Sequence, residues 1–313
     1  MLCGFDRTRL IGRGALPASH HVTSVARWFA LTVALFQGAC QKAVPEQRLS
    51  RPATGVHPVI VESLGLGPWG YRTPPERRGY RVEQRAIVEI HVASTVRRDT
   101  VGSEAELAFS FYPADERLSG SLSAFSVLAP DRQHAVAPGL VLPVAFAGEL
   151  PANGRQIVFT SPDEAAPCAQ GALSVLQSLR DVWLRPPDTL RLLGTWSDSA
   201  TFRSCRDGIP LLVRSSRSFT VVSATVERGR PKLVVRRESE STITGSDNGS
   251  ADVVEVSGAS TGHATYELFP TTGELARATG TATLELTLSS RHRVQSARQV
   301  TTFVVRSNSV DKP

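Results

Sequence analysis

Two cysteines in the second half of the chain, Cys168 and Cys205, have the residue type and the spacing for a disulfide bond. No histidine lies beside either one, so a zinc site would lack ligands. A catalytic thiol would also need a base and an electropositive pocket. In an oxidising compartment such a pair usually closes. Its loop of about 37 residues would stabilise the fold by roughly 3–4 kcal/mol in the chain-entropy model.

Catalytic motifs are the next candidates for chemistry, and few residues are suitable. The sequence contains no H-E-x-x-H pair and no P-loop, and GSLSA at 120–124 is not a nucleophile elbow. The loop SDNGSAD at 246–252 lacks the spaced oxygen ligands of a calcium site. We therefore expect a non-catalytic protein without cofactor or metal, although a triad assembled from distant residues stays open. The histidines after residue 39 share no local ligand spacing, and we expect the two on strands to lie at the surface or a cavity edge: His57, His91, His134, His263 and His292.

A short apolar run, residues 28–36, lies between Arg27 and the small residues before Cys40. A membrane-spanning helix needs about 20 apolar residues, roughly twice the length of this run. The pattern is typical of a signal peptide, so we expect residues 1–39 to be removed. Met1 is the only methionine, and an arginine-rich composition suggests GC-rich coding. We therefore expect a GTG start near Val22 or Val25, with residues 1–24 as annotation overhang.

The run Gly38-Ala39-Cys40 resembles the lipobox of bacterial lipoproteins. The resemblance covers about five residues and implies that Cys40 becomes the lipidated first residue of the mature chain. It further implies an exported protein, held on a membrane at the periplasm or outer envelope. Gln37 stands where that family favours an aliphatic residue. Two alternatives therefore stay open: a plain secretory signal with an incidental Cys40, and a cytosolic chain.

The composition after residue 39 excludes some partners and suggests one large or two small domains. The remaining chain has 31 basic minus 28 acidic residues, a net charge of +3. No Lys/Arg block of the nucleic-acid-binding type is present, so we expect no nucleic-acid partner. Residues 40–80 are rich in Pro, Gly and Arg and predict a tether, within which 59–71 is apolar enough to dock on the body. We expect a β-rich domain over 81–307 and a disordered tail at 308–313.

Hydrophobic alternation predicts a mainly β fold. From Val82 to Val96 apolar residues alternate with polar ones, which predicts one long half-buried strand. The segments 105–113 and 118–128 continue the pattern and complete an antiparallel meander. More strands follow, among them SFTVVSATVE, PKLVVRRESE, ADVVEVSG, ATYELF, Leu275–Leu288 and RQVTTFVVR. The expected architecture is a curved antiparallel sheet or half-barrel of long strands, with a minor α component.

One helix is predicted near residues 161–185. SPDE at 161–164 has the form of a capping box, and an apolar stripe that includes Leu179 and Trp183 follows it. Cys168 would lie near the start of this stripe. Cys205 lies in SDSATFRSCRDG, which we interpret as a polar loop. The predicted disulfide would therefore join the helix to that loop.

Small residues lie on one face of the strand Leu275–Leu288: Ala276, Ala278, Gly280 and Ala282. Two explanations are open. The helix that carries Trp183 packs over Ala278 and Gly280, or the sheet bends and leaves a groove for an apolar ligand between helix and sheet. In the second case the groove would be formed by these four residues together with Leu179 and Trp183.

Long antiparallel strands around a helix, behind a lipoprotein signal, resemble the periplasmic lipoprotein-carrier family of LppX-like half-barrels. The resemblance rests on YELFPTTGELARATGTATLELTL at 266–288 and LLGTWSD at 192–198. It implies a membrane-anchored lipoprotein that binds a lipid or another apolar ligand without catalysis, and no binding residue can be carried over. Two alternatives remain: an envelope interaction module with a solid core, and an exported hydrolase of unrecognised type.

Overall fold

The computed structural model describes eleven stretches of the chain: 67–72, 77–112, 117–128, 134–136, 142–149, 158–159, 180, 184–206, 209–247, 253–291 and 293–308. The chain divides into two compact units, 1–42 and 43–313, and every described residue belongs to the second unit. The predicted signal peptide, Cys40, Cys168, Leu179 and Trp183 lie outside the described residues. Within the described stretches, no helix is long and apolar enough to cross a membrane.

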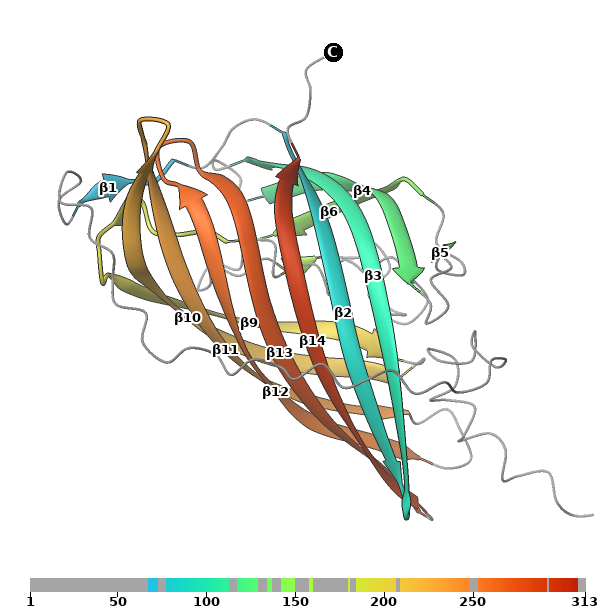
Figure 1. The fold of residues 1–313 in the computed structure, drawn as a ribbon. Helices are drawn as coiled ribbons and strands as arrows, with labels where there is room; N and C mark the ends of the chain where they lie inside the picture. The colour runs from blue at the N-terminus through green and yellow to red at the C-terminus, as the bar shows by residue number, and fades with distance from the viewer. Residues whose placement is uncertain are drawn as a thin grey trace, which may run out of the picture. The chain divides into compact units, whose positions relative to one another are not determined.

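The fold of the second unit is built on a twelve-stranded sheet in which all pairings between neighbours are antiparallel. Its order is β7-β6-β4-β3-β2-β14-β13-β12-β11-β10-β9, with β5 paired to β4. The curved sheet of long strands predicted from the sequence is thus confirmed (Figure 1). The strands are β2 Arg78–Val92, β3 Thr95–Tyr112, β4 Arg117–Leu128, β5 His134–Val136, β6 Val144–Glu149, β7 Val158–Phe159, β9 Thr195–Arg206, β10 Ile209–Glu227, β11 Arg230–Asp247, β12 Val254–Phe269, β13 Glu274–Ser290 and β14 Arg293–Asn308.

A two-stranded ribbon pairs β1, Trp69–Gly70, with β8, Thr189–Leu190. Trp69 and Leu190 are both buried in the core of the main sheet. The prediction that the apolar segment at 59–71 docks on the body is therefore confirmed at Trp69. The rest of that segment up to residue 66 lies outside the described residues.

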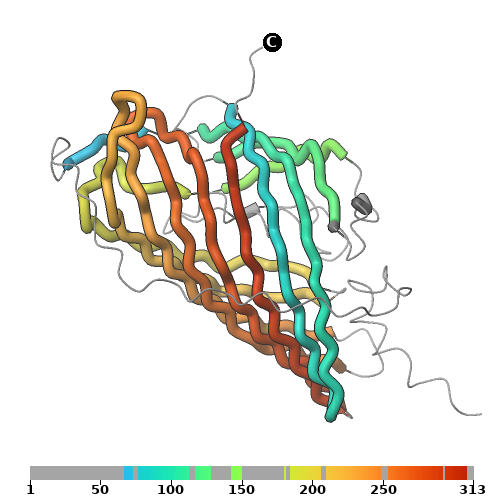
Figure 2. The backbone as a smooth tube through the Cα atoms, viewed as in Figure 1, coloured from blue at the N-terminus to red at the C-terminus, as the bar shows by residue number. Residues whose placement is uncertain are grey.

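Strand alternation gives the sheet one buried face and one polar face, which we call the outer face. On β10 the residues Leu211, Val213, Phe219 and Val221 are buried, while the residues between Leu211 and Phe219 on the other parity are mostly exposed. The strands from β10 through β14 to β2 and β3 lie side by side and bend together, as the tube view shows (Figure 2). Because side chains alternate with a period of two, the pairing of neighbouring strands determines which residues face inward, and this pairing shifts at irregularities such as Val221/Ser223 and Glu267/Leu268.

The buried face carries two separate apolar clusters. The first core cluster holds 23 buried residues and draws on eleven strands, β2 to β4, β6, β10 to β14 and the ribbon β1–β8. The second core cluster lies toward the other end of β9 to β13 and consists of Ala200, Phe202, Ile209, Leu211, Val213, Ile243, Val256 and Leu286. The first core cluster consists of Trp69, Tyr80, Val82, Ala105, Leu107, Phe109, Phe111, Leu118, Leu122, Phe146, Leu190, Phe219, Val221, Ala224, Leu233, Val235, Ala264, Tyr266, Leu268, Leu275, Ala278, Phe303 and Val305.

Two predicted elements differ from the structure. The strand expected to run from Val82 to Val96 ends at Val92, and a two-residue turn at Ala93 and Ser94 leads into β3. Val96 lies beyond that turn and is 59% exposed. The segment around Cys205, predicted as a loop, forms β9 instead, because Ala200 and Phe202 alternate with exposed polar residues. The meander of β2, β3 and β4 is confirmed, with Leu107, Phe109 and Phe111 buried.

Candidate functional site

Two rows of residues cross the buried face between the two core clusters, and we call them the belt. The first row runs through cross-strand neighbours Asp198, Arg217, Ser239, Gly262, Ala282, Thr301 and Ala86. The second row runs through Ser215, Ser241, Ser260, Leu284, Gln299 and Val88. Since these rows lie between two mainly apolar clusters, the polarity of the buried face changes along the strand direction.

The part of the belt on β9 to β12 is polar. Arg217 donates two hydrogen bonds to Asp198, from Nε at 2.8 Å and from Nη2 at 2.6 Å, and both side chains are 1% exposed. Beside this ion pair, the Ser241 hydroxyl donates to Ser215 Oγ at 3.0 Å. Ser260 lies directly opposite Ser241. Three serines on adjacent strands therefore form a ladder of hydroxyl groups, which we call the serine ladder.

The part of the belt on β13 and β2 is apolar and open. Ala282, Leu284, Ala86 and Val88 are each half-buried, in contrast to the fully buried residues of the first core cluster. On β14, between these strands, Gln299 donates a hydrogen bond from Nε2 to Thr301 Oγ1 at 2.9 Å. The accessible surface in the middle of the buried face is thus hydroxyl-rich on one side and mainly aliphatic on the other.

The four small residues predicted to line a groove on β13 have different environments. Ala276 is an extra residue at an irregularity of the β12–β13 ladder, so Leu275 takes the buried position in its place. Ala278 is fully buried in the first core cluster. Gly280 lies beneath the ring of Phe303, its cross-strand neighbour, and Ala282 stays half-buried. The ring of Phe303 on the adjacent strand therefore occupies the space beside Gly280, while the predicted helix lies outside the described residues, so its packing and the groove both stay predictions.

Two polar groups border the belt on the side of the first core cluster. Arg237, 1% exposed, donates a hydrogen bond from Nη1 to the Tyr266 hydroxyl at 2.9 Å. Trp196 stacks on Phe219 with ring centroids 4.9 Å apart, two residues before Asp198 on β9. In the described part of the chain, its indole N–H is buried without a hydrogen-bond partner. A buried unpaired donor costs about 1–3 kcal/mol, so an acceptor at this position would be stabilising.

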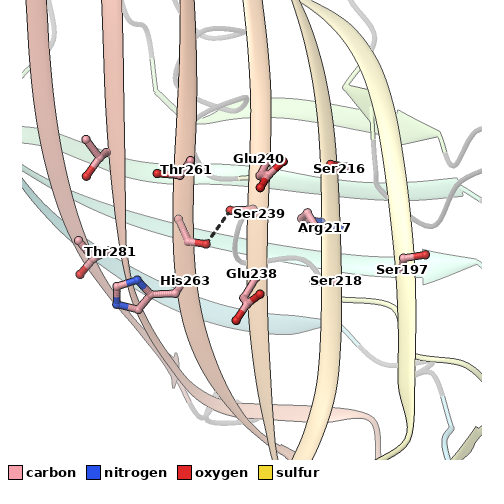
Figure 3. Close-up of a pocket in the computed structure, with 12 residues that line it drawn as sticks. Ser197, Ser216, Arg217, Ser218, Glu238, Ser239, Glu240, Thr261, His263 and Thr281 are labelled. Atoms are coloured by element: carbon pink, nitrogen blue, oxygen red, sulfur yellow. Dashed lines mark hydrogen bonds between the residues drawn. The ribbon is translucent and has the colours of Figure 1, made fainter. Parts of the chain in front are cut away.

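The outer face carries a second concave surface, which we call the outer trough. It consists of two depressions of about 570 and 860 Å³ over β9 to β13, which share Ser216, Glu240 and Thr261. Figure 3 shows the smaller depression, with the labelled hydroxyl, carboxylate and imidazole side chains distributed over neighbouring strands. Its lining contains no aromatic ring other than the imidazole of His263. This surface suits hydrogen bonding to a polar partner rather than burial of an apolar one.

Within the outer trough, His263 faces Glu238 on β11 and Thr281 on β13 (Figure 3). This order of hydroxyl, imidazole and carboxylate matches the residue types of a catalytic relay. However, no hydrogen bond joins the three side chains among those the structure gives for the described residues. The surrounding strands are paired on both sides, so their backbone N–H groups are committed to the ladders rather than to an oxyanion. His263 and His91 are both exposed, as the sequence predicted.

The segment GASTG at 258–262 matches the pattern G-x-S-x-G of a nucleophile elbow, in addition to the GSLSA segment rejected above. A nucleophile elbow requires the serine on a sharp strand-to-helix turn. Ser260 lies instead in the middle of β12, on the buried face, opposite Ser241 and Leu284. His263, the nearest histidine in sequence, is on the outer face. The strand context therefore assigns Ser260 to the serine ladder and not to a hydrolase elbow.

Cys205, near the end of β9, is disulfide-bonded. Cys168, its predicted partner, lies outside the described residues, so the pairing stays a prediction. No group of three or more His, Cys, Asp or Glu side chains in the described stretches is arranged to hold a metal ion. Arg180 lies with its guanidinium carbon 4.3 Å from the centre of the Phe202 ring, in the second core cluster.

No family model matches the chain, and no curated protein matches it. Among solved structures, one of lipid–protein interactions in lipovitellin is 12% identical, with a TM-score of 0.42, and covers 77% of this chain. The chain spans only 26% of that protein. OccK2 (OpdF) of Pseudomonas aeruginosa is 7% identical, with a TM-score of 0.24, over 76% of this chain and 100% of that one.

A DUF1329 family protein from Desulfovibrio piger is 10% identical, with a TM-score of 0.15, over 74% of this chain and 87% of that one. All three TM-scores fall below 0.5. These likenesses therefore carry no argument about what the chain binds.

Proposed function

We propose that the protein is a non-catalytic, exported lipoprotein, anchored through Cys40, that binds an apolar ligand such as a lipid on the buried face of its curved sheet. The observation that supports this function is the half-buried aliphatic surface of Ala282, Leu284, Ala86 and Val88. Apolar surface between two filled core clusters gains from being covered, at about 25 cal/mol per Å² removed from water. An acyl chain is a cover of the right chemistry.

Extraction of the protein from its own membrane, followed by native mass spectrometry, tests for a ligand. We expect bound species at lipid masses. A matched pair of variants then locates the site with N-phenyl-1-naphthylamine, an uncharged apolar fluorophore. Ala282→Trp fills the open surface and should weaken binding at least tenfold, whereas Thr283→Trp on the outer face should leave it unchanged. Ligand-free extracted protein, or equal binding by both variants, would contradict the proposal.

The anchor has its own test, because the ligand and the attachment are separate parts of the proposal. Cys40→Ser should abolish incorporation of labelled palmitate and release the protein in soluble form. Membrane association that persists unchanged in this variant would remove the anchor while leaving the ligand proposal untouched.

The outer trough favours a second function, that of an envelope interaction module. The Ser, Thr, Glu and His side chains that line its smaller depression, among them Glu240, suit a partner that presents hydrogen-bonding groups. A photoreactive residue placed at Glu240 should then give crosslinks in living cells, and one placed at Glu255, on β12 outside the trough, should give none. Crosslinks at neither position, with lipid found in the extracted protein, would leave ligand binding as the sole function.

A further inference from the structure

The accessible middle of the buried face is divided between polar and aliphatic groups. On β11 and β12 the half-buried residues of the belt are Ser239, Ser241, Ser260 and Gly262, and on β13 and β2 they are Ala282, Leu284, Ala86 and Val88. Ser260 and Leu284 are direct cross-strand neighbours, so the polar and aliphatic parts meet without a gap. The Ser241 donor is already used by Ser215, but a pure hydrocarbon would cover the Ser260 hydroxyl without offering it a partner, which carries a desolvation cost.

The charged groups of the belt are not available to a ligand head group. Arg217 and Asp198 are 1% exposed at the side chain and neutralise each other. Arg237, on the adjacent strand, is 1% exposed and contacts Tyr266. The polar groups that remain accessible are therefore uncharged hydroxyls. They hydrogen-bond to hydroxyl, ester or amide groups and offer no countercharge to an anion.

The indole N–H of Trp196 adds an independent observation. It is a buried donor without a partner in the described stretches, and it lies on the edge of the belt next to Asp198. A donor of this kind pairs with a carbonyl oxygen. On β9 it lies four residues from Ala200, the cross-strand neighbour of Ser215, so it is a second, separate donor at the border of the belt. The polar linkage itself is placed by the serine ladder, whose hydroxyls both donate and accept.

We infer that the ligand is an uncharged amphiphile, such as an acyl ester with a hydroxyl-bearing head. Its polar linkage lies at the serine ladder, and its chain lies along Ala282, Leu284 and Ala86. This inference rests on the proposed function, because it names the class of ligand for the same face. The serine ladder is then a specificity determinant: it distinguishes uncharged esters from hydrocarbons of equal length and from fatty-acid anions.

Displacement of N-phenyl-1-naphthylamine by three twelve-carbon compounds tests the inference on the full mature protein. The compounds are 1-monolauroylglycerol, laurate and 1-chlorododecane. We expect the monoglyceride to bind about tenfold more tightly than either of the others, which corresponds to one or two net hydrogen bonds. The double variant Ser241→Ala/Ser260→Ala should lose this preference and keep its affinity for 1-chlorododecane.

The outer-face double variant Thr242→Ala/Thr261→Ala changes the neighbouring residues on the same strands and should keep the preference. Equal affinities for the three compounds, tighter binding of laurate, or an unchanged preference in the serine variant would overturn the inference and leave the proposed function standing. If none of the compounds displaces the fluorophore and the fluorophore itself does not bind, the proposed function fails with it.

Discussion

The two core clusters share several long strands, but they differ in how many strands contribute side chains to them. The first core cluster draws on eleven strands and includes eight aromatic residues, whereas the second draws on five neighbouring strands and contains Phe202 as its single aromatic residue. In the first, side chains from β4 and β6 pack with those from β10 and β11, far away in the sheet order. At the other end, the described members of the second core cluster come from the neighbouring strands β9 to β13.

The difference suggests that the two ends of the long strands have different roles in the fold. A region that packs across the sheet fixes its curvature, and a region that packs only between neighbours can adapt to what lies on it. The belt separates these two regions, so events at the ligand surface need not disturb the first core cluster. Local opening is expected to occur where fewer apolar contacts hold the structure.

The largest expected effect comes from removing an aromatic ring in the first core cluster. Phe219 is 1% exposed and stacks on Trp196, so Phe219→Ala should destabilise the protein by about 4 kcal/mol. The matched variant Phe202→Ala in the second core cluster should cost less, about 3 kcal/mol or below, because its neighbourhood relaxes more easily. Urea unfolding measures both. Equal losses, or faster amide exchange in β2 and β3 from Phe202→Ala, would contradict the proposed independence of the two clusters.

The alternation of apolar and polar residues along the strands is sufficient to predict the sheet and much of the first core cluster. Leu107, Phe109 and Phe111 were assigned to one face from their spacing alone, and they are buried. The turn at Ala93 and Ser94 was missed because it contains neither Gly, Asn nor Asp, although Ala93 has a positive φ of 51°. The turn pairs Val92 with Thr95, so the inward positions change from even to odd residue numbers, and Val96 lies on the face opposite to Val92.

The belt was harder to predict for a different reason. Ser215, Ser216, Arg217 and Ser218 are consecutive polar residues, so no alternation indicates which of them face the core. Which of these side chains point to the buried face depends on how β10 pairs with β9 and β11. In that pairing, Asp198 and Ser239 are the cross-strand neighbours of Arg217. The pairing of β14 with β2 is likewise a contact between distant parts of the sequence. Such contacts are set by the whole sheet and leave no local pattern.

The buried ion pair of the belt provides the second test of the comparison. Asp198→Leu leaves Arg217 buried without its carboxylate and should cost about 3 kcal/mol. The double variant Asp198→Leu/Arg217→Met removes both charges and should recover most of that loss, because apolar groups of similar size can replace a buried pair. Chemical denaturation of the single and double variants decides. A double variant no more stable than Asp198→Leu would mean that the pair is needed for more than mutual neutralisation.

The first core cluster should also respond to alkaline pH in a way that the second, which has no tyrosine, cannot. Burial raises the pKa of Tyr80 from its usual value of 10.0 to about 12. The unfolded chain ionises first as pH rises, so stability is intact below pH 10 and falls between pH 10 and 12. The loss should approach about 2–3 kcal/mol, at 1.36 kcal/mol for each pKa unit. Unfolding free energies of wild type and Tyr80→Phe should therefore converge, or cross, over this range. A constant difference between them from pH 9 to 12 would refute the assignment.

The smallest expected effect concerns the gap that small residues leave on β13. A Cβ added at Gly280 would lie 2.5 Å from Cε1 of Phe303, so Gly280→Ala should cost about 1–2 kcal/mol through overpacking. At Gly262, inside the belt, the nearest atom would be Ser239 Oγ at 3.0 Å, and Gly262→Ala should be tolerated better. The pair Gly280→Ala/Phe303→Leu separates the causes, because it removes the ring that the new methyl group meets. A double variant that loses as much stability as the two single variants together would place the clash at the backbone carbonyl oxygen of His263. That oxygen lies 2.7 Å from a Cβ at Gly280. Recovery in the pair would instead establish that Phe303 fills the space left by Gly280, and that the open surface of the sheet begins only at Ala282.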